Sequence, residues 1–322
     1  MNRKYASYVI MFLFITMLAA CSNDGGIEKV GILTEGTLDE KVWDQKGYDA
    51  LLQLKDEHDF NIYTKTNINN KNNTIDAVDE LSRQGVNLIF GHSSNYGRDF
   101  VEIASHYPDL HFVYFNGSLT SENVTSLNFD SHAMGFFAGM LAAKMTKTNQ
   151  VGVIAAYEWQ PEIEGFFEGV KFENPDSQVR VDYIYDWNDK DIAVHIFEKM
   201  REKNVDVFYP TGDSYSKEII RKAYEDHVYA IGYLDDEAEL FPNTVLSSTV
   251  QHIDKLYEFA TKQLANNKLN GKVYTFDFQD DAITMGKYGE MVPTEYKELL
   301  NTAILEYKET GFLPNQFITN EN

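Results

Sequence analysis

The stretch Val30-Gly31-Ile32-Leu33 has a counterpart about 120 residues later, Val151-Gly152-Val153-Ile154. Each is a short apolar run that leads into a polar segment, a pattern typical of a strand buried on both faces of a sheet. Other segments repeat at a similar distance: residues 85–91 with 204–209, 111–115 with 228–232, and 123–126 with 243–246. Where the repeats align residue by residue, the offset is 119 to 121 residues. The chain therefore contains two similar halves.

Helical patterns separate these apolar runs. In the first half they include Tyr48, Leu51 and Leu52, and later Ile75 and Val78. Helices that alternate with short buried strands indicate a parallel sheet that is covered on both faces. We therefore expect an α/β protein made of two lobes.

Ligands of open α/β sheets bind outside the carboxyl ends of the strands. The loops that follow the apolar runs are residues 34–43, 91–96, 116–117, 156–161, 210–215 and 233–237. If the two lobes face each other, these loops line one cleft. We expect hinge closure between the lobes to hold a ligand there.

The N-terminal segment has the pattern of a lipoprotein signal. Arg3 and Lys4 precede a short apolar run that ends in small residues and Cys21, the only cysteine of the chain. The run is too short to cross a bilayer, which needs roughly 20 apolar residues. In the resemblance to bacterial lipoproteins, residues 1–20 are removed, Cys21 carries a diacylglyceryl group, and residues 21–27 form a tether. We expect a membrane partner and lipid anchoring on the extracytoplasmic face of the cell membrane.

Composition limits the classes of function. Without residues 1–20 the chain has 26 basic and 50 acidic residues, a net charge of −24. Such a surface repels phosphate backbones, so we expect no direct nucleic-acid partner. The length suits two lobes, which we expect to comprise residues 28–131 plus about 247–278, and 132–246 plus about 279–322.

The sequence contains no constellation that indicates an enzyme. The eight histidines do not form an HExxH pattern, and no GxGxxG or phosphate-binding loop appears. The acidic loop Asp235-Asp236-Glu237 has no histidine beside it, so a solvated loop is the simpler interpretation. We expect no catalytic residues, no metal site and no cofactor.

Several stretches resemble the basic membrane protein family, the nucleoside-binding lipoproteins of bacterial import systems. The matching stretches are Val124–Asp130, Gly135–Ala143, Asn149–Ile154, Tyr229–Gly232 and Val245–Val250. The resemblance implies a two-lobed periplasmic-binding-protein type I architecture, in which each lobe is a parallel sheet with helices on both faces. It also implies that Trp43 takes the place of an aromatic residue that stacks on the base, although a core or interface role for Trp43 remains open.

The polar partners that the family uses for a nucleoside are replaced in this chain. Val42 and Asp44 take the places of the serine and the asparagine that flank the aromatic residue, and Asn116 replaces an aspartate. Leu234 stands where the family has the aspartate that pairs with ribose hydroxyls, and Gln251 stands where it has a lysine. A site that reads hydroxyl groups depends on such partners. We therefore expect weak binding of ordinary nucleosides.

A closer similarity is to regulators within this group that act positively on competence, upstream of the transcription factor ComK in Gram-positive sporeformers. The stretches that carry it are Val42-Trp43 with Lys46–Tyr48, Val86–Leu88 with Gly91-His92, Ala133–Phe137, Trp159–Glu162, Tyr209-Pro210 with Gly212-Asp213, and Ser248–Gln251. It implies a membrane-anchored regulator without catalysis. The alternative is the substrate-binding component of an importer, with a small-molecule ligand and a membrane permease as partners.

The positions at the strand ends give the candidate cleft residues. They are Trp43, Asp44, His92, Asn116, Trp159, Gly212, Asp213, Asp236 and Gln251. Trp159 either faces Trp43 and encloses a planar ligand or makes a packing contact. The segment that begins at His92 either presents backbone N–H groups to a ligand or caps a helix.

Overall fold

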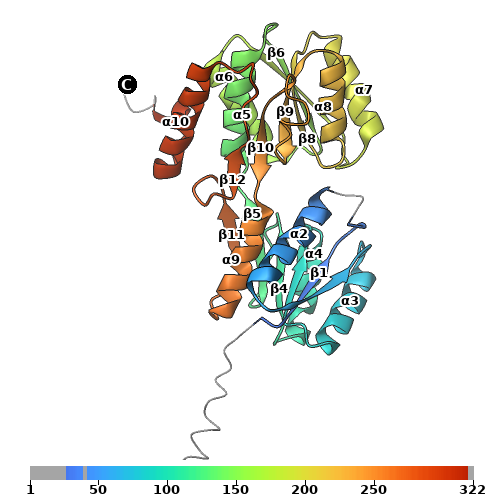
Figure 1. Cartoon of the computed structure of the whole chain (residues 1–322). Helices are drawn as coiled ribbons and strands as arrows, with labels where there is room; N and C mark the ends of the chain where they lie inside the picture. The colour runs from blue at the N-terminus through green and yellow to red at the C-terminus, as the bar shows by residue number, and fades with distance from the viewer. Residues whose placement is uncertain (1–26, 39–41, 318–322) are drawn as a thin grey trace, which may run out of the picture.

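A computed structural model describes residues 27–38 and 42–317 of the chain. They form two lobes, drawn one above the other in Figure 1. The first lobe contains β1 (Lys29–Leu33), α2 (Val42–Glu57), β2 (Asn61–Lys65), α3 (Lys71–Arg83), β3 (Leu88–Gly91), α4 (Tyr96–Ile103), η1 (Ala104–His106), β4 (His111–Phe115), β5 (Val124–Phe129), α9 (Ile253–Ala265) and β11 (Val273–Phe276).

The second lobe holds the other elements. They are α5 (His132–Met145), β6 (Gln150–Ala155), α6 (Pro161–Glu173), β7 (Gln178–Tyr183), α7 (Lys190–Arg201), β8 (Val207–Thr211), α8 (Ser216–Glu225), β9 (Tyr229–Leu234), β10 (Val245–Gln251), β12 (Ile283–Met285), α10 (Thr294–Thr310) and α11 (Pro314–Phe317).

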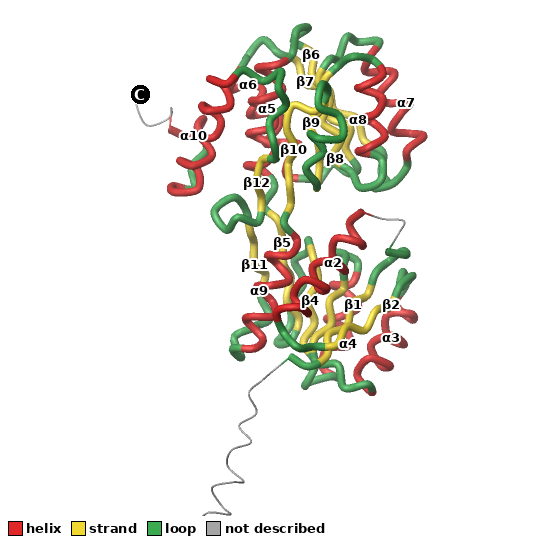
Figure 2. The backbone as a smooth tube through the Cα atoms, in the orientation of Figure 1, coloured by secondary structure: helices red, strands yellow, loops and turns green. Residues whose placement is uncertain are grey.

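The two sheets have the same topology, which confirms the repeat expected from the sequence. The strand order is β11-β5-β4-β3-β1-β2 in the first lobe and β12-β10-β9-β8-β6-β7 in the second. Every pairing in the first sheet is parallel, whereas β12 runs antiparallel to β10 in the second. Helices cover both faces of each sheet (Figure 2), so the predicted two-lobed α/β architecture is confirmed.

The chain crosses between the lobes after β5, after β10 and between β11 and β12. The second crossing lies later than the expected position near residue 247. The strand β10 extends to Gln251 because it pairs with β9 in the second sheet, and the first lobe resumes with α9, which packs on α2. One buried hydrophobic cluster extends through both lobes, from Val30 and Ile32 to Val151 and Tyr209.

Helix α5 is apolar on every side, since all of its residues from Ala133 to Ala143 are buried. It approaches α6 closely because glycines face backbone on the partner helix. A Cβ atom on Gly139 would lie 2.2 Å from the Phe166 carbonyl oxygen, and one on Gly169 would lie 1.9 Å from that of Phe136. The contact is reciprocal, so neither helix has room for a methyl group.

We predict that Gly139→Ala destabilises the second lobe. The methyl group forces the two backbones apart, and overpacking of this kind costs about 1–3 kcal/mol. This cost exceeds the gain of up to about 1 kcal/mol in helix propensity. Chemical denaturation measures the change in the free energy of unfolding.

Gly85→Asn serves as the control for loss of a glycine. Gly85 has φ +79°, a Cβ atom at this position would meet nothing nearer than 3.4 Å, and asparagine tolerates the left-handed region. Equal stabilities of Gly139→Ala and the unchanged chain would contradict the packing argument.

Candidate functional site

Trp43 and His92 hold each other in place at the cleft edge of the first lobe. Trp43 lies in the first turn of α2, and His92 directly follows β3. The Trp43 indole N–H donates to the His92 carbonyl oxygen at 3.1 Å, and His92 Nε2 lies 2.8 Å from the Trp43 carbonyl oxygen. Their rings stack with centroids 4.9 Å apart and an interplanar angle of 18°. One face of the indole is therefore covered by the protein itself.

The hydrogen bonds of His92 fix its tautomer. A carbonyl oxygen only accepts, so Nε2 carries the proton toward Trp43. The other ring nitrogen, Nδ1, then accepts from the Tyr257 hydroxyl of α9 at 2.8 Å. The ring is fully buried, and burial lowers the pKa of the His92 imidazole from 6.5 to about 4. The imidazole is therefore neutral at physiological pH.

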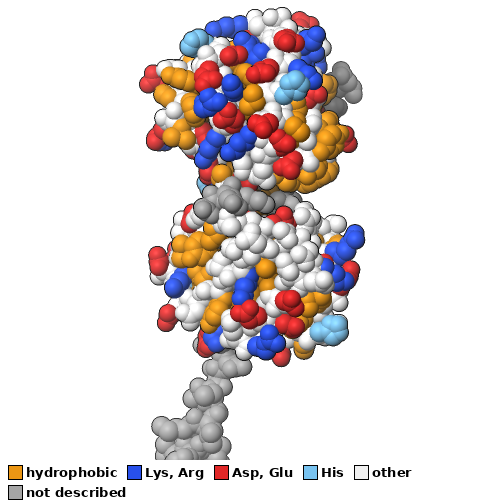
Figure 3. Space-filling view, turned by 90° about the vertical axis from the view of Figure 1, so that its right-hand side faces the viewer, with side chains coloured by type: hydrophobic (Ala, Val, Ile, Leu, Met, Phe, Trp, Pro, Cys, Tyr) orange, Lys and Arg blue, Asp and Glu red, His pale blue; other side chains and the backbone are white. Residues whose placement is uncertain are grey.

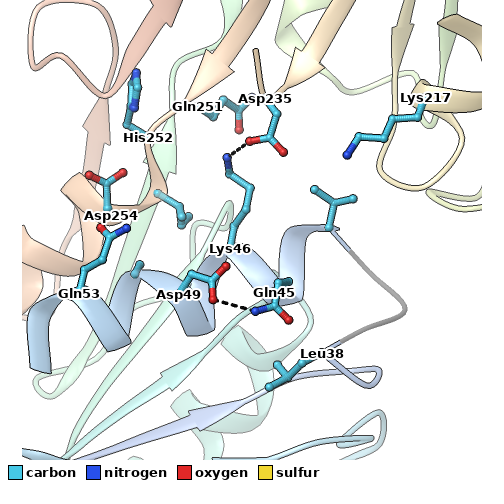
Figure 4. A pocket seen from close by; sticks show the side chains of 13 residues that line it. Leu38, Gln45, Lys46, Asp49, Gln53, Lys217, Asp235, Gln251, His252 and Asp254 are labelled. Atoms are coloured by element: carbon cyan, nitrogen blue, oxygen red, sulfur yellow. Dashed lines mark hydrogen bonds and ion pairs between the residues drawn. The ribbon is translucent and has the colours of Figure 1, made fainter. Parts of the chain in front are cut away.

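Helix α2 makes polar contacts with the second lobe. The Trp43 backbone N–H donates to Asp213 Oδ1 at 3.3 Å, in the loop after β8. Lys46, one turn further along the helix, forms an ion pair with Asp235 and donates to the Leu234 carbonyl oxygen at 3.3 Å. Trp43 and Lys46, three residues apart on α2, thus both contact the second lobe, and Figure 4 shows the Lys46–Asp235 pair.

A pocket of about 610 Å³ lies between the lobes beside these contacts. Its wall on α2 includes Gln45, Lys46 and Asp49, and its wall on the other side includes Asp235 and Gln251. Figure 4 shows the Lys46–Asp235 pair in the middle of the pocket and Lys217 pointing toward it from the second lobe. The pocket is polar and open, and the protein's own ion pair occupies its centre.

A buried polar network lies in the second lobe, at the start of α6 and beside the carboxyl ends of β8 and β9. Glu162, near the start of α6, accepts from the Gln160 side chain at 2.8 Å and from the Tyr233 hydroxyl at 2.9 Å. Gln160 also donates to the Thr211 carbonyl oxygen at 2.9 Å. Burial raises the pKa of the Glu162 carboxyl. The network ties the ends of three strands together and was not predicted from the sequence.

Comparison with known proteins assigns the chain to a family. The family model described as ABC transporter substrate-binding protein PnrA-like, named Bmp, matches residues 27–316. This chain belongs to the Bmp family. It is 40% identical over 309 residues to the transcriptional activator protein Med of Bacillus subtilis (strain 168). The aligned region covers 95% of this chain and 98% of that protein.

Solved structures agree with this assignment. The crystal structure of a transcriptional activator of the comK gene from Bacillus halodurans has a TM-score of 0.83 and 40% identity, and covers 89% of this chain and 99% of that one. A solute-binding protein of an ABC transporter system from Conexibacter woesei has a TM-score of 0.71 at 16% identity, over 89% of this chain and 99% of that one. At 16% identity, the similarity to the Conexibacter woesei protein shows only that the two proteins share a fold.

The Bmp framework places three of the candidate residues at the interface between the lobes. Trp43 and Asp213 contact each other across it, and Gln251 lines the pocket. His92 is a buried partner of Trp43, and no ring contact joins Trp43 to Trp159. Instead, Trp159 contacts two aromatic residues of the second lobe.

Other candidate residues have roles in shaping loops. Asp44 is buried and accepts from the Gly36 N–H at 3.2 Å, while Asp236 accepts from the Lys287 N–H at 2.9 Å. Asn116 has φ +55° and turns the chain after β4. Gly212 leaves room for the ring of Tyr215, which a Cβ would meet at 2.0 Å.

The sequence analysis missed the residues that fill the pocket. Lys46 and Lys217 were not candidates for the cleft, and Asp235 was expected there only as part of the loop 233–237. Lys46 lies three residues after Trp43 and therefore on the same helix face. Cys21 lies outside the described residues. Within residues 27–38 and 42–317, no group of three His, Cys, Asp or Glu side chains could hold a metal ion.

We predict that His92 makes the protein less stable at mildly acidic pH. Its pKa is lower in the folded chain, so between pH 6.5 and 4 the unfolded chain binds the proton and the folded chain does not. From pH 7 to pH 5 this costs about 2 kcal/mol of the free energy of unfolding. Urea denaturation of the wild type and of His92→Gln at both pH values measures the difference in pH dependence.

The exposed histidine at position 106 provides the control, and His106→Gln should keep the wild-type pH dependence. NMR titration of the His92 ring in the wild type gives the pKa directly and does not depend on how well His92→Gln folds. An equal loss of stability in the wild type and His92→Gln, or a ring pKa near 6.5, would contradict the prediction.

Proposed function

We propose that this Bmp-family chain is a membrane-anchored, solute-binding-type lipoprotein that acts as a positive regulator of competence by raising transcription of comK. The observation that carries the proposal is the set of contacts in the cleft. The Trp43 ring stacks on His92, and Lys46 donates a hydrogen bond to the Leu234 carbonyl oxygen. The family framework is retained while the partners for a nucleoside are not. The 40% identity to Med and to the comK activator supports the regulatory part.

The regulator acts from the membrane rather than on DNA. The expected net charge of −24 opposes contact with phosphate groups. The N-terminal pattern ending at Cys21 favours lipid anchoring on the extracytoplasmic face, and no described helix is long and apolar enough to cross a membrane. We infer that the protein binds and signals without catalysis, through a small molecule or a membrane partner.

A second candidate function is that of the substrate-binding component of an importer. The family description and the interlobe pocket of about 610 Å³ favour it. In this case the ligand displaces the Lys46–Asp235 pair, and a membrane permease is the partner. The substrate would be a small solute that does not need the ribose-binding aspartate.

Deletion of the gene tests the regulatory function. We predict that a comK promoter reporter loses activity several-fold in the deletion strain and recovers with a wild-type copy. A copy with a stop codon at position 43 produces the transcript without the full protein. It should not restore the activity of the reporter.

An unchanged reporter would contradict the proposal. If a compound from a screen of small solutes, nucleosides included, in addition raises the melting temperature of the purified protein, the importer function is favoured, because a ligand at 100 times its Kd adds about 2.7 kcal/mol to the free energy of unfolding.

Labelling with palmitate tests the anchor. Since Cys21 is the only cysteine, a thiol-linked lipid has one position to occupy. We predict that cells incorporate labelled palmitate into the wild type and not into Cys21→Ser, as seen by immunoprecipitation and autoradiography. Label that remains in Cys21→Ser, or is absent from the wild type, would contradict the lipoprotein interpretation.

A further inference from the structure

Four aromatic side chains form a cluster at the carboxyl ends of β6 and β7. They are Tyr157, Trp159, Tyr185 and Trp187, and include two of the three tryptophans of the chain. Ring centroids lie 5.7 Å apart for Tyr157 and Trp159, and 5.8 Å apart for Trp159 and Trp187. The Trp159 side chain is 59% exposed and that of Tyr185 is 61% exposed. Clustered exposure of this extent is unusual for large aromatic residues and often marks an interaction site.

The backbone at Tyr185 is in a conformation that side chains disfavour. Its φ is +61°, in the left-handed region that costs a residue with a side chain roughly 1–2 kcal/mol. The Tyr185 N–H donates to the Ala156 carbonyl oxygen at 2.9 Å, and its hydroxyl donates to Glu158 Oε1 at 2.8 Å. These bonds hold an exposed ring in place, so core packing does not account for the strain. Strain of this kind concentrates at functional positions.

The charges around the aromatic cluster are acidic. Glu158 bonds to Tyr185, and Asp186 lies between Tyr185 and Trp187. Burial raises the pKa of Tyr157, and the charged groups that raise it further are Asp186 and Glu35, the latter from the first lobe. Aromatic faces beside carboxylates suit a cation.

We propose that the aromatic cluster binds an arginine side chain of a partner protein. A guanidinium group is planar, so it can stack flat on the exposed face of Trp159 while its N–H groups reach the Glu158 carboxylate. A quaternary ammonium group binds where aromatic rings surround it. A planar group that is held between two parallel rings requires the planes of those rings to be about 7 Å apart. Tyr157 and Trp159 are closer than that, at 5.7 Å.

The aromatic cluster is connected to the contact between the lobes. The Asp213 N–H donates to the Trp187 carbonyl oxygen at 3.0 Å, and the Asp213 carboxylate accepts from the Trp43 N–H. Glu35 belongs to the loop that leads from β1 toward α2. One backbone hydrogen bond therefore links the cluster, through Trp187, to Asp213, which contacts α2.

Binding of a labelled hexa-arginine peptide tests the proposal. Fluorescence anisotropy is measured with the full chain in detergent at 0.15 M salt, where diffuse attraction to an acidic protein is screened. We expect saturable binding, weaker binding of hexalysine, and a loss of about tenfold in affinity for Trp159→Ala. Glu158→Gln should also weaken binding.

Phe167→Ala is the matched control, because Phe167 is an exposed aromatic residue (48%) followed by the carboxylate Glu168. It should leave the affinity unchanged, and circular dichroism checks that each variant folds. Equal affinity of Trp159→Ala and the wild type would show diffuse electrostatic binding and overturn the proposal. Displacement of the peptide by millimolar choline, or absence of saturable binding, would also overturn it.

Discussion

Helix α2 packs directly against the buried His92 imidazole. The position of α2 in turn determines how the lobes meet. A Cβ atom on Gly47 would lie 2.5 Å from the His92 ring, so a glycine in α2 lets the helix come down onto it. The same helix carries Trp43 and Lys46, whose contacts reach Asp213 and Asp235 in the other lobe. A change in the packing of one buried ring therefore alters the geometry between the two sheets. The space-filling view shows that the molecule narrows between the two lobes (Figure 3).

This arrangement limits how a base could stack on Trp43 in the cleft. One face of the Trp43 indole stacks on His92 with ring centroids 4.9 Å apart, which leaves only the other face for a base. The edges of Phe115 and Phe129 also contact the indole. Base stacking on the covered face would require His92 to leave a buried place in which both ring nitrogens have partners, and unpaired buried polar groups are costly.

The repeat in the sequence predicted the fold because strand burial and strand order depend on local patterns that recur in both halves. The cleft was predicted only in part. Positions after the strands identified Trp43, Asp213 and Gln251, since topology alone brings strand ends together. The stack of Trp43 on His92 depends on side-chain conformations 49 residues apart, which no local pattern encodes. Lys46 did carry a signal, its spacing from Trp43 along one helix face, but the choice of Asp235 as its partner depends on how the lobes meet.

Leu234 contributes to the contact between the lobes through its backbone and to the core through its side chain. Asn116, directly after β4, and Leu234, the last residue of β9, lie at corresponding strand ends of the two halves, and both have positive φ, +55° and +71°. An aspartate, which the family resemblance places at position 234, tolerates this conformation better than leucine does. The leucine side chain is instead 5% exposed and joins the hydrophobic cluster that extends through both lobes. Because its carbonyl oxygen accepts from Lys46, Leu234 also helps to hold the lobes together.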